Sequence, residues 1–159
     1  MMIRTLLPLA ALSLLAACDA PEKAAPVSDI TVTVTDALCR PTPVGRQMTG
    51  CYMTLTASGD DRLVSIASPV AGRIEIHESK IEGGMMMMTE MANGVPLPAG
   101  QAVELKPGGN HIMLLAVADP LTVGETVPLT LTFASAAPVE VAAPVAQPPV
   151  AIGAAPAAH

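Results

Sequence analysis

The chain has 159 residues and a formal net charge of −6, with 51% hydrophobic and 14% charged residues. One Tyr, one Phe and no Trp leave little aromatic surface, so a core must be built from aliphatic side chains and methionine. Lys and Arg are few and scattered. The sequence therefore lacks the basic surface that nucleic-acid binding requires, and no nucleic-acid partner is expected.

The first segment, MMIRTLLPLAALSLLAAC, has the pattern of a secretory signal peptide. Arg4 precedes an apolar run from Leu6 to Leu15, and that run is too short to span a bilayer. The letters LAAC, which end at Cys18, resemble a bacterial lipobox, in which the chain is cut before a cysteine that receives lipid. The resemblance implies a signal peptide over residues 1–17 and a lipid anchor on Cys18. An ordinary signal peptide with a cysteine nearby is the alternative.

Composition divides the rest of the chain into three parts. Residues 18–28 are polar, contain Ala and Pro without periodicity, and are expected to form a tether. Residues 135–159 are rich in Pro and Ala and are expected to form a disordered tail. A single domain is therefore predicted over residues 29–134.

Within that domain, Gly, Pro and Asp separate short apolar segments, and helical periodicity is absent. The segment ITVTVT alternates apolar and polar residues as a half-buried strand does. Repeated short strands with turn residues between them predict an all-β sandwich or small barrel. The expected strands are residues 30–35, 51–57, 62–68, 72–78, 102–106, 111–117 and 126–133.

The three cysteines have different expected roles. If Cys18 carries lipid, Cys39 and Cys51 are the only pair left, and an exported protein can keep a disulfide. Eleven residues separate them, so they do not form the CxxC pattern of thiol-redox enzymes. We expect a structural disulfide worth roughly 3 kcal/mol by loop-closure entropy. Two free thiols are the alternative.

Histidine and methionine side chains recur on predicted strand faces. Residues two apart in a strand share a face, so His77 lies on the polar face of its strand. The same rule puts His111 and Met113 side by side in HIMLL. It also divides the run MMMM (85–88) into two faces if that run is extended. The candidate cluster is His77, Met88, His111 and Met113, with Met86 as an auxiliary member.

Imidazole together with neutral thioether is a soft ligand set. Methionine sulfur favours Cu(I), whereas hard cations prefer carboxylates and zinc sites rarely use Met. Each residue taken alone also has an ordinary explanation. His77 can be a solvated side chain, Met113 can fill the core, and the methionine run can be an exposed apolar patch.

The combined spacing and flanking sequence resemble the periplasmic copper chaperone family of the PCu(A)C type. Ten residues separate His77 from Met88, and His111-x-Met113 follows within ELKPGGNHIMLL. The resemblance extends from about residue 40 to residue 133.

The chain departs from the family pattern at one place. Between Met88 and His111 lie twenty-two residues, one more than the pattern has. We expect the turn at residues 91–94 to absorb the extra residue; otherwise Met86 or Met87 would replace Met88 as a ligand.

The resemblance implies a cupredoxin-like β-sandwich or barrel that binds Cu(I) and transfers it to an acceptor protein. In the family the acceptor is typically the copper centres of cytochrome c oxidase. The implied protein is a monomeric periplasmic lipoprotein of a Gram-negative-type bacterium, anchored to a membrane by lipid, and not an enzyme. The implied copper ligands are His77, Met88, His111 and Met113.

The sequence also allows other functions. A copper-free structural or interaction lipoprotein and a copper storage or tolerance protein are the alternatives. A blue-copper electron carrier is disfavoured because no Cys follows Cys51 to supply the thiolate such sites need. No nucleophile elbow, CxxC, paired-carboxylate arrangement or phosphate loop indicates an enzyme. For Met85, Met86 and Met87 we expect either a docking rim or auxiliary thioethers during transfer.

Overall fold

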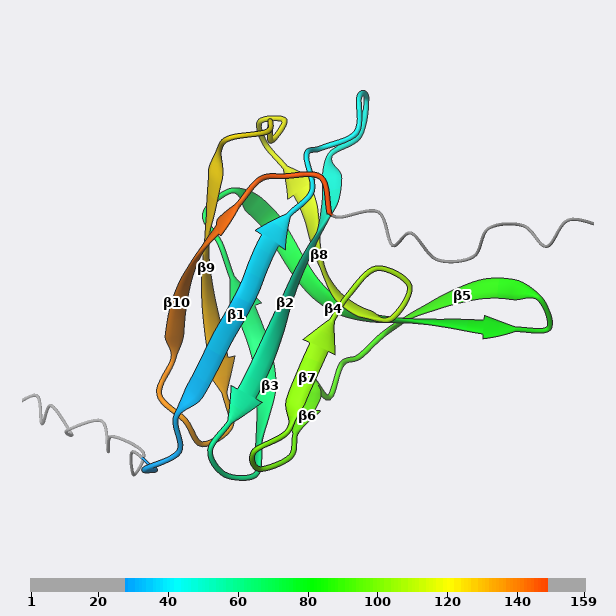
Figure 1. The fold of residues 1–159 in the computed structure, drawn as a ribbon. Helices are drawn as coiled ribbons and strands as arrows, with labels where there is room; N and C mark the ends of the chain where they lie inside the picture. The colour runs from blue at the N-terminus through cyan, green and yellow to red at the C-terminus, as the bar shows by residue number, and fades with distance from the viewer. Residues whose placement is uncertain (1–27, 149–159) are drawn as a thin grey trace, which may run out of the picture.

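The computed structural model describes residues 28–148 as two antiparallel β-sheets packed face to face (Figure 1). The signal peptide, Cys18, the tether up to residue 27 and residues 149–159 lie outside this range. Residues 28–148 contain no helix, and thus none long and apolar enough to cross a membrane. The strands are β1 (Val32–Cys39), β2 (Met48–Ala57), β3 (Asp61–Ala67), β4 (Ala71–Glu82), β5 (Met85–Glu90), β6 (Val95–Leu97), β7 (Ala102–Leu105), β8 (Asn110–Val117), β9 (Thr126–Phe133) and β10 (Val139–Pro144).

The predicted all-β sandwich is confirmed. One sheet has the order β1-β2-β8-β4-β5, with β7 also paired to β2, and the other has the order β10-β9-β3-β6. The seven predicted strands correspond to β1, β2, β3, β4, β7, β8 and β9, while β5, β6 and β10 were not predicted. All strand pairs within the sheets are antiparallel.

The core is aliphatic, as the composition requires. Along β2 every second residue is buried, from Cys51 through Met53 and Leu55 to Ala57. Phe133 is the one aromatic residue in the core of the described chain, whereas the ring of Tyr52 lies on the outer face of its sheet. The period of two therefore fixes which face of β2 packs inward and which is available for a site.

The predicted disulfide is present. Cys39 and Cys51 face each other directly in the β1–β2 pair, with 4.0 Å between their Cα atoms, and are joined by a disulfide. Both residues are fully buried. The bond therefore joins two strands of the sheet inside the core.

The predicted domain end at Ala134 was wrong, because β10 continues the second sheet. Val139 pairs with Leu131, and the register continues to the end of β10. In the segment VEVAAPV, alternate residues point inward from Val139 to Val145, and Val145 bridges to Cys39. This alternation is a strand signal that the Pro- and Ala-rich composition concealed.

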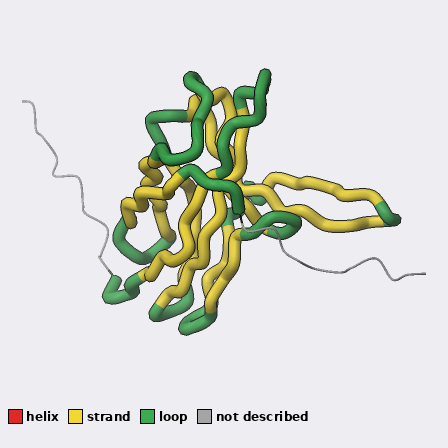
Figure 2. The backbone as a smooth tube through the Cα atoms, turned by 45° about the horizontal axis from the view of Figure 1, so that its top comes forward, coloured by secondary structure: helices red, strands yellow, loops and turns green. Residues whose placement is uncertain are grey.

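The hairpin of β4 and β5 projects from the sandwich as an arm (Figures 1 and 2). Glu82 pairs with Met85, and the two residues between them are Gly83 and Gly84, both with positive φ of 58° and 81°. Two consecutive glycines at positive φ suit the tight turn that matches the twist of a hairpin. The four methionines are extended, because they form part of strand β5. All six residues of β5 are exposed, so these methionines do not belong to the core.

Candidate metal centre

The two candidate histidines meet on the outer face of the first sheet. His77 of β4 and His111 of β8 are direct partners in the strand register. Their rings lie edge to face, with centroids 5.8 Å apart. His111 is 6% exposed, and the side chain of His77 is 15% exposed. Neither is the solvated side chain that a lone strand histidine usually is.

Hydrogen bonds determine which nitrogen of each ring carries the proton. Nε2 of His77 lies 2.7 Å from Oε2 of Glu75, and Nδ1 of His111 lies 3.0 Å from the carbonyl oxygen of Gly109. A carboxylate and a carbonyl only accept hydrogen bonds, so each of these nitrogens donates. In the neutral rings, Nδ1 of His77 and Nε2 of His111 then hold the free lone pairs.

One of these free nitrogens has no partner. Nδ1 of His77 is buried and makes no hydrogen bond to any described residue. Buried polar atoms are nearly always satisfied, so an orphan requires an explanation. A lone-pair nitrogen withdrawn from solvent beside a second imidazole is what a metal ligand requires.

Two methionines flank the histidine pair. On one side, Met113 of β8 lies opposite Glu75 in β4 and Gly50 in β2. On the other side, Met88 of β5 lies opposite Ser79 in β4. Positions 75, 77 and 79 share a face, so the neighbours of this row lie on the same face as His77. The structure thus brings imidazoles and thioethers from β4, β5 and β8 together.

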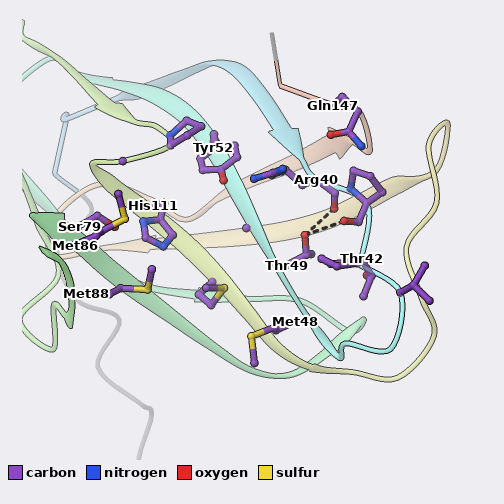
Figure 3. A pocket seen from close by; sticks show the side chains of 17 residues that line it. Arg40, Thr42, Met48, Thr49, Tyr52, Ser79, Met86, Met88, His111 and Gln147 are labelled. Atoms are coloured by element: carbon purple, nitrogen blue, oxygen red, sulfur yellow. Dashed lines mark hydrogen bonds between the residues drawn. The ribbon is translucent and has the colours of Figure 1, made fainter. Parts of the chain in front are cut away.

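A cleft of about 590 Å³ opens over this face. Met86, Met88 and His111 lie along one side of it, and Arg40 and Gln147 lie on the other (Figure 3). Met113 also lines the cleft, whereas His77 does not. Donors of two strands, β5 and β8, are therefore accessible from one opening.

Tyr52 forms part of the cleft wall beside His111. The two rings are tilted with centroids 6.5 Å apart. A side chain at Gly50 would place its Cβ 3.0 Å from the Tyr52 hydroxyl oxygen, so glycine leaves room for this ring. The chain's single Tyr is therefore an internal optical probe of the site.

The face assignments made from sequence are confirmed for all five candidate residues. Their roles as metal ligands remain a prediction, as does the placement of the extra residue in the hydrogen-bonded turn Met91–Gly94. The sequence alone assigned no role to Glu75, Tyr52 and Met48, which lie on the same face. The period of two places Glu75 on the face of His77, two residues away, but it does not predict their hydrogen bond.

Comparison with known proteins identifies relatives of this chain. The family described as "Putative lipoprotein LpqE-like" matches residues 32–145. The protein "Putative lipoprotein Lxx21020" of Leifsonia xyli subsp. xyli is 37% identical over 90 residues, which are 57% of this chain and 54% of that protein. The chain thus spans about half the length of this curated relative.

Solved structures share the fold. The apo PCuAC domain from PmoF1 is 26% identical with a TM-score of 0.62, covering 76% of this chain and 98% of that domain. Apo-DR1885 of Deinococcus radiodurans is 32% identical with a TM-score of 0.56, covering 93% and 96%. Its Cu(I) form is 33% identical with a TM-score of 0.54, covering 81% and 84%. The cupredoxin-like fold implied by the family resemblance is confirmed.

Proposed function

The chain belongs to the LpqE-like family and has the fold of PCuAC domains, and we propose that it is a copper chaperone that binds Cu(I) and transfers it to an acceptor protein. The proposed ligands are His77, Met88, His111 and Met113, with Met86 as an auxiliary thioether. The Cu(I) form of the structural relative DR1885 supports copper binding by this fold.

The observation that carries the proposal is the histidine pair with fixed tautomers. Each ring of the pair keeps one lone-pair nitrogen, and that of His77 is buried and orphaned. Thioethers of Met88 and Met113 lie on the same face. Two neutral imidazoles and two neutral thioethers suit Cu(I), and thioethers bind it without first losing a proton.

The uneven exposure of the donors suits transfer. His111 is 6% exposed, whereas Met88 is 49% exposed on a strand that has a neighbour on one side only. An incoming ligand can therefore displace the Met88 thioether first while the histidines still hold the ion. We propose the copper centres of cytochrome c oxidase as the acceptor, on the basis of the family resemblance. In this role the protein handles copper without catalysing a reaction.

The location follows from the N-terminal sequence and the relatives. We propose that Cys18 carries lipid and anchors the chain to a membrane, with the copper cleft in the periplasm. The LAAC sequence supports this, as do the lipoprotein descriptions of the family and of the Leifsonia protein.

Cu(I) titration of the full chain in detergent, against a competing chelator, tests the proposal. We expect one tight site that is weakened at least about tenfold, or about 1.4 kcal/mol, by either His111→Ala or Met88→Ala. Met87→Ala is the matched control, because Met87 is a neighbour on the opposite face of β5. Binding that is absent, or indifferent to both changes, would contradict the proposed site.

A transfer measurement separates delivery from storage. The Cu(I)-loaded chain is mixed with an apo copper-binding domain of an oxidase subunit, and the copper content of each is measured after separation. A chelator present in the mixture captures any copper that is released as free ions. A chaperone passes its copper to the acceptor domain without loss to this chelator, whereas a storage protein retains its copper.

A further inference from the structure

The carboxylate of Glu75 is held on both sides within the proposed copper face. One oxygen accepts the hydrogen bond from Nε2 of His77 at 2.7 Å, and the other lies 3.0 Å from Nε of Arg73. The Glu75 side chain is 13% exposed, so this contact is shielded from water. Glu75 also lies opposite Met113 in the strand register. It therefore lies between two proposed ligands without being one.

This contact determines which atom of His77 can bind an ion. If Glu75 were absent, the neutral ring could carry its proton on either nitrogen. With Glu75 in place, the proton stays on Nε2 and the lone pair stays on the buried, unpartnered Nδ1. Carboxylates that accept a hydrogen bond from a ligating histidine fix its tautomer and orientation and increase its basicity.

The negative charge of Glu75 also favours copper binding. All four proposed donors are neutral, so bound Cu(I) brings an uncompensated positive charge to the face. Arg73 is largely exposed and its charge is screened by water, whereas Glu75 is not. The nearby negative charge therefore stabilises the bound ion.

We infer that Glu75 is a positioning residue for copper, which holds His77 in the tautomer that presents Nδ1 to the ion. The expected effect of Glu75 on Cu(I) affinity rests on the proposed copper-binding function, whereas the tautomer of His77 does not. The tautomer exists in the copper-free chain and can be measured there.

The first test is ¹⁵N NMR of the histidine rings in the copper-free full chain in detergent. We expect His77 to be protonated on Nε2 alone in the unmodified chain and to become a mixture of tautomers in Glu75→Ala. Glu75→Gln keeps the shape and also loses the restriction, because an amide can pair with either tautomer. A His77 that is protonated on Nδ1 in the unmodified chain, or one whose tautomer is unchanged in both variants, would overturn the inference.

The second test is Cu(I) affinity. We expect Glu75→Ala to weaken binding about 10- to 100-fold, and Glu75→Gln to weaken it by a smaller factor in the same direction. Glu78→Ala is the matched control, because Glu78 is on the same strand and its replacement removes the same charge. Its side chain pairs with Lys80 at 2.7 Å and lies on the other face of β4. Equal losses in Glu75→Ala and Glu78→Ala would show a general charge effect and overturn the positioning role.

The two proposals fail in different ways. If His111→Ala leaves Cu(I) affinity unchanged, the copper site itself is wrong, whatever Glu75 does. If His111→Ala abolishes binding but neither Glu75 variant alters affinity or the His77 tautomer, only the role of Glu75 is wrong. Dispersion of the backbone amide spectrum identifies a variant that fails to fold, and in that case Glu75→Gln decides.

Discussion

Methionine occupies two opposite environments in this protein. In β2, Met53 is 2% exposed and is surrounded by core residues, whereas Met85 to Met88 in β5 are 48–68% exposed. The difference comes from the neighbours of each strand: β2 is paired on both sides and covered by the second sheet, while β5 is paired only to β4. The same flexible thioether thus fills space in one region and is left accessible to soft metals and partner proteins in the other.

The largest expected effect concerns the part of the core built by β10. A chain that ends after Ala134 loses β10 and exposes the core beside β9 and Cys39. We expect it to lose cooperative thermal unfolding, measured by circular dichroism, whereas a chain that ends after Pro148 unfolds like the full chain. Equal melting curves for the two truncations would show that β10 adds nothing to the core.

The next prediction compares the two environments directly. Met53→Ala should lower the free energy of unfolding by about 2–5 kcal/mol, because it removes a buried side chain and leaves a cavity. Met87→Ala should change it by no more than about 0.5 kcal/mol, because the side chain is exposed. Denaturant titration of both variants measures this contrast. Similar losses in both would mean that the arm is packed against something in solution.

The disulfide is expected to contribute to stability and not to Cu(I) binding. Replacing Cys39 and Cys51 together with Ala should cost roughly 3 kcal/mol of unfolding free energy. Neither cysteine lines the cleft, so Cu(I) affinity should stay as in the unmodified chain. A parallel fall in affinity would imply that the β1–β2 link holds the cleft open.

The smallest effect on equilibrium binding is expected from the three methionines of β5 that precede Met88. Replacing Met85, Met86 and Met87 together with Leu keeps an apolar surface but removes three thioethers. We expect Cu(I) affinity to stay close to that of the unmodified chain and transfer to the acceptor to slow. Stopped-flow measurement of copper exchange checks the rate. A large fall in affinity would show that these residues are ligands rather than part of the approach.

Much of the fold could be predicted because its strands follow a period of two. That rule places His77, His111 and Met113 on the correct faces from the sequence alone. After Ala134 the Pro- and Ala-rich composition predicts disorder, although VEVAAPV alternates as a strand does. The sequence predicts which side chains of the site share a face of a strand. The family resemblance supplies the spacing of the proposed ligands.

Other features depend on the tertiary arrangement and could not be predicted. The proximity of His77 to His111 requires knowing that β4 pairs with β8 and in which register. The tautomers follow from contacts with Glu75 and with the carbonyl oxygen of Gly109. A β4–β5 arm that projects from the sandwich, with its methionines exposed, requires knowing that no strand covers β5 in the described fold.

X-ray absorption at the copper edge of the Cu(I)-loaded full chain tests the central claim most directly, because it counts sulfur and nitrogen neighbours of the ion. The account predicts both kinds of neighbour in equal number, two imidazole nitrogens and two thioether sulfurs, with one sulfur lost in Met88→Leu. A coordination sphere of nitrogen and oxygen alone, or of sulfur alone, would contradict it.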